Sequence, residues 1–256
     1  MTSLATTIRD LHRRKARERR ALALAEGVRL VEEALAAGVP IQGAVAGPAL
    51  EATPRGRTLK AALAAAGVAV ESVTDAELLD LADTEQPQGV IAVIAPKEWA
   101  LADLAPAAGR PLLVCDGVQD PGNVGAMART ALALGASGLV ALPGTADLWN
   151  AKALRGSMGA LFRLPSLHAA DQEFLPWARE RGIALWSADV AGEDVRSIGR
   201  PTGPIALLLG NEGAGVRPEI ASVAVRRVAI PIQPGAESLN VAVAAGILLY
   251  EVTRGR

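Results

Sequence analysis

The chain has 256 residues, a formal net charge of −1 at pH 7, half of its residues apolar and about a fifth charged. A chain of this length and composition can bury one large core or two modest ones, which excludes extensive disorder. No apolar run reaches the roughly 20 residues that a membrane-spanning helix needs. The N-terminus has no apolar signal segment and Cys115 is the only cysteine, so we expect a cytoplasmic protein without disulfides or a cysteine metal cage.

Basic side chains crowd one short stretch near the N-terminus, namely Arg9, Arg13, Arg14, Lys15, Arg17, Arg19 and Arg20. A local basic patch can bind phosphate groups even when the whole chain is neutral. A solvated helical face or tail is an equally good interpretation of this stretch taken alone. Aromatic residues make up only 3% of the chain, so a base-stacking platform is not expected.

The first 95 or so residues predict a small α/β domain. Its elements, in chain order, are one long helix or two in succession over 10–37, a strand at 43–46, a helix at 58–66, a strand at 68–73, a helix at 75–81 with Asp75 as its N-cap, and a strand at 89–94. The stretch 95–111 contains three prolines and predicts a linker. We therefore expect domains at 1–97 and 111–256, joined by a linker at 98–110.

The second domain predicts a longer alternation of strands and helices. Strands are expected at 112–116, 138–142, 161–164, 183–188, 205–209 and 228–232, and helices at 124–134, 147–156, 172–181 and 240–254. Strands that are apolar throughout and separated by helices indicate a parallel sheet covered on both faces. In such an α/β fold, ligands bind at the carboxyl ends of the strands.

Three loops of this domain each follow a predicted strand: Asn123–Arg129, Gly210–Gly215 and Ser238–Val241. Asn123 and Ser238 are residue types that cap helices, and the three glycines at 210–215 let the main chain approach a ligand closely. Each loop alone is more readily structural than functional. The glycine spacing matches neither the dinucleotide fingerprint nor a P-loop, which makes an oxidoreductase a remote alternative.

The remaining reactive residue types predict structure rather than chemistry. Cys115 lies in a buried strand, where it is expected to be inert. His12 and His168 have no ligand spacing, so no metal site is expected. The stretch Arg155–Gly159 is not a nucleophile elbow, because it lacks the G-x-S-x-G pattern.

Read together, the three loops resemble the motifs of the SpoU (TrmH) branch of the SPOUT RNA methyltransferases. The first motif is N-x-G-x-x-x-R from Asn123 to Arg129, the second is G-N-E-x-x-G from Gly210 to Gly215, and the third is S-L-N-V from Ser238. The resemblance covers roughly residues 111–254. Upstream, 25–27 (Ala-Glu-Gly) and 86–89 (Gln-Pro-Gln-Gly) resemble the family's substrate-binding domain, which is similar to certain ribosomal proteins.

This resemblance implies a deep trefoil knot in the C-terminal domain, with S-adenosylmethionine bound there in a bent form. By motif position, the cofactor would be held by Leu209, Gly210, Asn211, Gly215, Ile230 and Leu239. The resemblance also implies a homodimer that shares RNA contacts between its subunits. The implied reaction transfers a methyl group to a ribose 2′-hydroxyl of RNA, with ribosomal RNA of the large subunit as the expected substrate, and needs no metal.

Arg129 is the residue that we expect to stabilise the developing alkoxide or to bind a substrate phosphate, because a guanidinium is a poor base. Asn123, Glu212, Ser238 and Asn240 would then orient Arg129 and the ribose. Two alternatives remain open: the same reaction on transfer RNA, and a non-catalytic RNA-binding assembly factor. The complete set of polar motif residues disfavours the second alternative.

Overall fold

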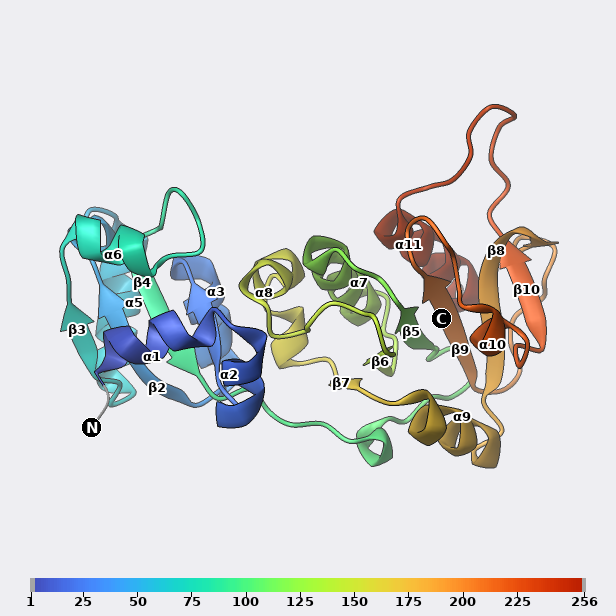
Figure 1. Cartoon of the computed structure of the whole chain (residues 1–256), viewed down its shortest axis with the longest axis horizontal. Coiled ribbons are helices and arrows are strands. Elements are labelled where there is room, and N and C mark those ends of the chain that lie inside the picture. Colours follow the sequence, from blue (N-terminus) through green and yellow to red (C-terminus); the bar gives the residue numbers. More distant parts are fainter. Residues whose placement is uncertain (1–2, 255–256) are drawn as a thin grey trace. The chain divides into compact units, whose positions relative to one another are not determined.

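The computed structural model describes residues 3–254 and shows an α/β protein, as the sequence predicts (Figure 1). The chain forms two compact units. The first consists of Met1–Lys97 together with Trp149–Phe162, and the second of Glu98–Leu148 together with Arg163–Arg256. Each unit has its own sheet.

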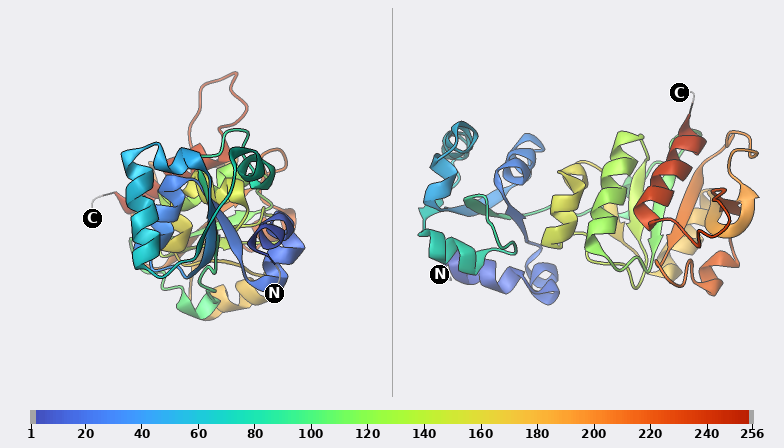
Figure 2. Two further views of the ribbon diagram at one scale, coloured as in Figure 1. Left: turned by 90° about the vertical axis from the view of Figure 1, so that its left-hand side faces the viewer. Right: turned by 90° about the horizontal axis from the view of Figure 1, so that it is seen from above.

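The first unit is built on a four-stranded sheet in the order β1-β4-β2-β3. Strand β4 (Val90–Ile94) is antiparallel to β1 (Ala23–Glu26) and to β2 (Ile41–Ala46), whereas β2 and β3 (Val70–Ser72) are parallel. The helices of its N-terminal part are α1 (Leu4–Leu11), α2 (Arg14–Arg20), α3 (Val28–Ala36), α4 (Pro48–Glu51), α5 (Pro54–Ala65) and α6 (Asp75–Leu81). Helices α1 and α6 pack on one face of the sheet, and α3 and α5 lie on the other (Figure 2).

The prediction of one long helix or two in succession over 10–37 is wrong at Ala23–Glu26, which form a buried edge strand between helices α2 and α3. Helix α2 ends where Ala21 adopts a left-handed conformation, with φ of 52°. The next residues pair with β4, so sheet formation overrides the helical propensity of Ala and Leu. Helix α6 has the predicted bounds, but its N-cap is Thr74, which forms a capping box with Glu77.

The second unit contains a six-stranded, fully parallel sheet in the order β10-β8-β9-β5-β6-β7, which confirms the predicted parallel sheet. Its strands are β5 (Leu112–Asp116), β6 (Gly138–Ala141), β7 (Ser166–His168), β8 (Ala184–Asp194), β9 (Ile205–Gly210) and β10 (Arg226–Ala229). Helices α7 (Pro121–Ala133) and α11 (Val241–Thr253) cover one face, and α9 (Asp171–Glu180) and α10 (Pro218–Ala221) cover the other (Figure 2).

Several segments after residue 97 differ from the prediction. Residues 161–164 are not a strand, because the positive φ angles of Met158 and Gly159 lead into the short 3₁₀ turn Ala160–Phe162. Strand β8 runs to Asp194, six residues beyond the predicted end, and the short helix α10 has no counterpart in the prediction. The predicted linker contains a further 3₁₀ turn, Leu101–Asp103.

Helix α8 (Ala151–Ser157) belongs to the first unit, although the sequence predicts its residues within the second domain. Arg155 donates to Asp83 at 2.7 Å and lies 3.7 Å from a carboxylate oxygen of the buried Glu26. Gly159 has a φ of +84°, and a Cβ there would lie 2.6 Å from the side chain of Glu33. The stretch Arg155–Gly159 therefore serves as a packing segment.

Candidate functional site

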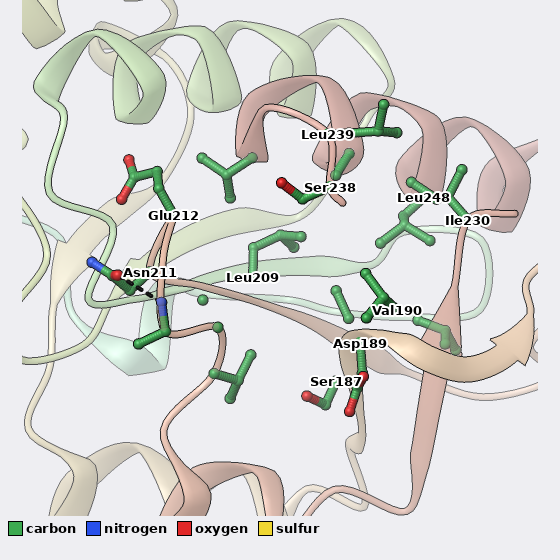
Figure 3. Close-up of a pocket in the computed structure, with 18 of the residues that line it drawn as sticks. Ser187, Asp189, Val190, Leu209, Asn211, Glu212, Ile230, Ser238, Leu239 and Leu248 are labelled. Carbon is green, nitrogen blue, oxygen red and sulfur yellow. Dashed lines mark hydrogen bonds between the residues drawn. The ribbon is translucent and has the colours of Figure 1, made fainter. Parts of the chain in front are cut away.

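A cavity of about 560 Å³ lies in the second unit, at the carboxyl ends of β9 and β10 and beside residues 187–190 of β8 (Figure 3). The Gly210–Gly215 loop, the segment before α11 and one side of α11 complete its wall. Eight of the residues predicted from the motifs line it: Leu209, Gly210, Asn211, Glu212, Gly215, Ile230, Ser238 and Leu239. Residues of two motifs that are far apart in sequence therefore line one cavity. It lies at the edge of the sheet where parallel α/β folds bind ligands.

The loop after β9 is held in shape by its own hydrogen bonds. The main-chain N–H and C=O of Asn211 both pair with Gly215, at 2.9 Å each, and its side-chain oxygen accepts from the N–H groups of Gly213 and Ala214. The side-chain amide of Asn211 donates to the carbonyl of Gly117 at 3.0 Å. A Cβ on Gly210 would lie 1.9 Å from the carbonyl carbon of Gly215, so only glycine fits there.

A chain of directed hydrogen bonds joins all three motifs. The side-chain amide of Asn240 donates to the side-chain oxygen of Asn123 at 3.0 Å, and the amide of Asn123 donates to the carboxylate of Glu212 at 2.9 Å. Glu212 also accepts from the main-chain N–H groups of Gln119 and Asp120, at 3.3 and 3.4 Å. The sequence predicts that the three motifs lie in one place, and these hydrogen bonds show that they are in direct contact.

The surroundings of Glu212 favour its ionised form. Partial burial raises the pKa of this carboxyl group, but the hydrogen bonds from Asn123 and from main-chain N–H groups outweigh that effect. The pKa of Glu212 is therefore lower than its ordinary value. A carboxylate that accepts three hydrogen bonds from the segment 119–123 fixes the position of that segment and orients the amide of Asn123.

The predicted helix-capping roles of two residues are wrong. Helix α7 begins at Pro121 with Asp120 as its N-cap, so Asn123 lies inside the first turn. Proline favours the first helical position, which moves the helix start upstream of Asn123. Helix α11 is capped by Asn240, which accepts from Ala242 and Val243, and not by Ser238.

Arg129 and Ser238 stand apart from the hydrogen-bond chain. Arg129 is exposed on α7, six residues beyond Asn123, and it forms no ion pair or hydrogen bond within residues 3–254. Ser238 is exposed and lines the cavity (Figure 3). Both side chains are therefore accessible to a substrate.

The structure adds residues that the motifs do not reveal. Strand β8 contributes Ser187, Asp189 and Val190 to the cavity, and α11 contributes Leu248 (Figure 3). No signal in the sequence points to the first three, because β8 is weakly apolar and its extension past residue 188 is not predicted. Leu248 belongs to the apolar face of a predicted helix, where core and site residues look alike.

No group of three or more His, Cys, Asp or Glu side chains that could hold a metal ion is found in the described part of the chain, and no helix there is long and apolar enough to cross a membrane. Cys115 is fully buried in β5, and burial raises the pKa of its thiol to about 12. This thiol therefore stays protonated and unreactive, as the sequence predicts.

Comparisons with known proteins assign the family. Residues 110–250 match the model of the SpoU rRNA Methylase family, and residues 6–92 match an MRM3-like substrate binding domain. The chain is 33% identical to the 23S rRNA (guanosine(2553)-2'-O)-methyltransferase RlmP of Bacillus subtilis, over 95% of this chain and 93% of the relative. It is 35% identical to the 23S rRNA (adenosine(1067)-2'-O)-methyltransferase of Streptomyces laurentii, over 80% and 77%.

A solved structure agrees with this assignment. The AdoMet-bound rRNA methyltransferase of Sinorhizobium meliloti superposes with a TM-score of 0.86 at 34% identity and covers 99% of this chain and 97% of its own. The family model alone matches more than half of the chain, and the relatives extend the match to nearly all of it. The chain belongs to the SpoU rRNA methylase family.

Proposed function

We propose that this protein transfers a methyl group from S-adenosylmethionine to a ribose 2′-hydroxyl of RNA, and that the RNA is that of the large ribosomal subunit. The observation that supports this most directly is the convergence of three motifs on one cavity through Asn240, Asn123 and Glu212. Relatives that match this chain over both units are named as methyltransferases of 23S rRNA riboses.

The cavity fits the cofactor in size and in the chemistry of its wall. Leu209, Ile230 and Leu248 present apolar surface that suits a nucleoside base (Figure 3). The main-chain groups of Ile230 and Leu239 form no hydrogen bond with any residue between 3 and 254, so they are available to a ligand's polar edge. The bare backbone at Gly210 allows close approach. We propose that these residues, with Asn211 and Gly215, hold S-adenosylmethionine.

S-adenosylmethionine supplies an electrophilic methyl group on a sulfonium sulfur. The ribose 2′-hydroxyl is a weak nucleophile until it loses its proton, so negative charge on its oxygen must be stabilised. We assign that stabilisation to Arg129, whose guanidinium is exposed and free to contact substrate. Glu212, Asn123 and Asn240 hold the loops around the reacting groups, and Ser238 contributes an accessible hydroxyl.

The first unit is proposed to bind the RNA substrate, because residues 6–92 match a substrate-binding model. Several of its basic side chains are engaged: Arg9 pairs with Asp80, and Arg19 and Arg20 pair with Asp10. Arg13 and Lys15 are exposed and form no ion pair within the described part of the chain. We therefore propose Arg13 and Lys15 as contacts for RNA phosphates. We propose that residues 111–256 form the methyltransferase domain. The trefoil knot and a cytoplasmic location remain predictions.

A homodimer is proposed from the surface of α11. Val243, Ile247 and Tyr250 are 51%, 37% and 58% exposed and follow one another at intervals of four and three residues. That spacing places them on one stripe of the helix, opposite residues such as Leu249 that are buried. An exposed apolar stripe on a two-fold axis can pair with its own copy.

Calorimetry and a methyl-transfer assay test the proposed function together. The purified chain is expected to bind S-adenosylmethionine and to transfer its methyl group to unmodified large-subunit RNA, giving a 2′-O-methylnucleoside after digestion. Unmodified transfer RNA serves as the competing substrate. Binding of the cofactor without transfer to either RNA would favour a non-catalytic assembly factor instead.

A further inference from the structure

One ion cluster of the second unit lies outside the cavity and outside the three motifs. Arg217 follows the Gly210–Gly215 loop and precedes α10. Its main-chain N–H and its Nε both donate to the carboxylate of Asp116, at 2.7 Å each. Its two terminal nitrogens donate to both oxygens of Asp171, at 2.9 and 2.8 Å. We call these three residues the Arg217 clamp.

The Arg217 clamp lies directly after the Gly210–Gly215 loop and contacts the strand next to the start of that loop. Asp116 is the last residue of β5, is fully buried, and pairs in register with Gly210, the last residue of β9. Asp171 is the first residue of α9, on the other side of Arg217. The loop is thus fixed at its first residue by the sheet and just after its last by the clamp, while the residues between form part of the cavity wall.

The buried charge of Asp116 is compensated by Arg217, which Asp171 holds from the other side. A fully buried carboxylate is costly unless it is paired and hydrogen-bonded, and Arg217 supplies both to Asp116. The hydrogen bonds to Asp171 raise the pKa of Arg217, burial acts in the opposite direction, and the net result is a pKa above the ordinary value. The guanidinium therefore stays charged, and its planar fork satisfies two carboxylates at fixed angles.

From this geometry we infer that Arg217 is a positioning residue for the S-adenosylmethionine site: it holds the Gly210–Gly215 loop in the shape that receives the cofactor. This inference rests on the proposed function. Arg217 itself does not line the cavity, so it acts through the loop and not by touching the ligand. Loosening the clamp is expected to weaken cofactor binding and to leave the chemical step unchanged once the site is filled.

The experiment compares cofactor binding in the full-length wild-type protein and in the variants Arg217→Lys and Asp171→Asn. Lysine keeps the charge but cannot form the double fork, and Asp171→Asn leaves Asp116 paired, so both variants are expected to fold. Calorimetric Kd for S-adenosylmethionine is expected to rise about tenfold in each, which corresponds to about 1.4 kcal/mol. The KM for the cofactor should rise in parallel, while kcat at saturation stays within about twofold of the wild type.

Arg196→Ala is the matched control, since Arg196 forms an ion pair with Asp194 that is remote from the Gly210–Gly215 loop in sequence and does not line the cavity. Its Kd should equal that of the wild type. If the Kd values of Arg217→Lys and Asp171→Asn equal that of the wild type, the inference is wrong, whether or not the melting temperature falls. The Arg217 clamp would then contribute at most to stability. A wild-type chain that does not bind S-adenosylmethionine at all would instead overturn the proposed function, and the inference with it.

Discussion

Asn123 and Glu212 lie 89 residues apart in the sequence, yet the side-chain amide of the first donates to the carboxylate of the second at 2.9 Å. Asn240 lies 117 residues from Asn123 and extends the same chain of hydrogen bonds by donating to the Asn123 side-chain oxygen. Since Glu212 can only accept when ionised, the direction of both amides is fixed by its charge. The network therefore makes the relative position of three loops depend on one carboxylate.

The first prediction concerns pH. The pKa of Glu212 is lower in the folded protein than its ordinary value of 4.5, so its charge stabilises the fold above that pH and this contribution is lost as the pH falls through the lower, folded-state pKa. The free energy of unfolding of Glu212→Gln should thus be lower than that of the wild type at neutral pH, by less than about 1 kcal/mol because the group is exposed.

Urea unfolding of both proteins between pH 3 and pH 7 measures this difference. We expect the two curves of unfolding free energy against pH to converge as the pH drops below 4.5. A difference that stays constant over the whole range would show that the charge of Glu212 contributes nothing to the fold.

The second prediction compares two glycines of one loop. In Gly210→Ala the new methyl group would lie 1.9 Å from the carbonyl carbon of Gly215 and 2.0 Å from the nitrogen of Val216, so the loop must move. We expect a loss of about 3 kcal/mol of stability or more and no measurable binding of S-adenosylmethionine.

Gly213→Ala is the control in the same loop, because the nearest atom to its new methyl group is 3.6 Å away. Its stability should change by no more than about 0.5 kcal/mol. Thermal melting and calorimetry check both variants, and equal behaviour of the two alanines would contradict the tight packing of Gly210.

The third prediction concerns the surface of α11. Ile247→Asp places a charge in the middle of the exposed stripe that includes Val243 and Tyr250. If the stripe is the contact between two copies, this variant should be a monomer at concentrations where the wild type is a dimer. Light scattering coupled to size-exclusion chromatography measures the mass of both. Glu180→Gln on α9, on the opposite face of the sheet, should not change the mass, whereas a wild type that is already monomeric would refute the dimer.

The fourth prediction separates chemistry from cofactor binding. Arg129→Ala is expected to reduce methyl transfer by at least about a hundredfold, the scale of losing one group that stabilises a transition state. Because Arg129 does not line the cavity, the Kd for S-adenosylmethionine should change little. Arg129→Lys keeps the charge without the fork and should retain part of the activity. Wild-type turnover in Arg129→Ala would remove Arg129 from the reaction.

The sequence could predict the features that depend only on the residues of one segment and on the fold class. Strand β5 is uniformly apolar between turn residues, and its predicted bounds, Leu112–Asp116, agree with the structure. The joint location of Asn123, Glu212 and Asn240 follows from the rule that the carboxyl ends of parallel strands share one edge of a sheet. Both arguments need only the residues of each segment and the fold class.

Features that depend on distant partners could not be predicted in this way. Residues Ala23–Glu26 have the composition of a helix and become a strand only because β4 is there to pair with them. Arg217 lies in a segment without any motif, and its role emerges only when Asp116 and Asp171 are brought beside it, 101 and 46 residues away in sequence. The N-cap of α7 is Asp120 and not the predicted Asn123, because Pro121 favours the first helical position.

The central claim is that this protein methylates riboses of large-subunit ribosomal RNA, and mapping of 2′-O-methylation tests it most directly. Ribosomal and transfer RNA from cells with the gene, without it, and with the Arg129→Ala variant are compared nucleotide by nucleotide. We predict one 2′-O-methylated position in large-subunit RNA that is present only with the wild-type gene. Identical methylation in all three strains, or loss of a mark from transfer RNA alone, would contradict the account.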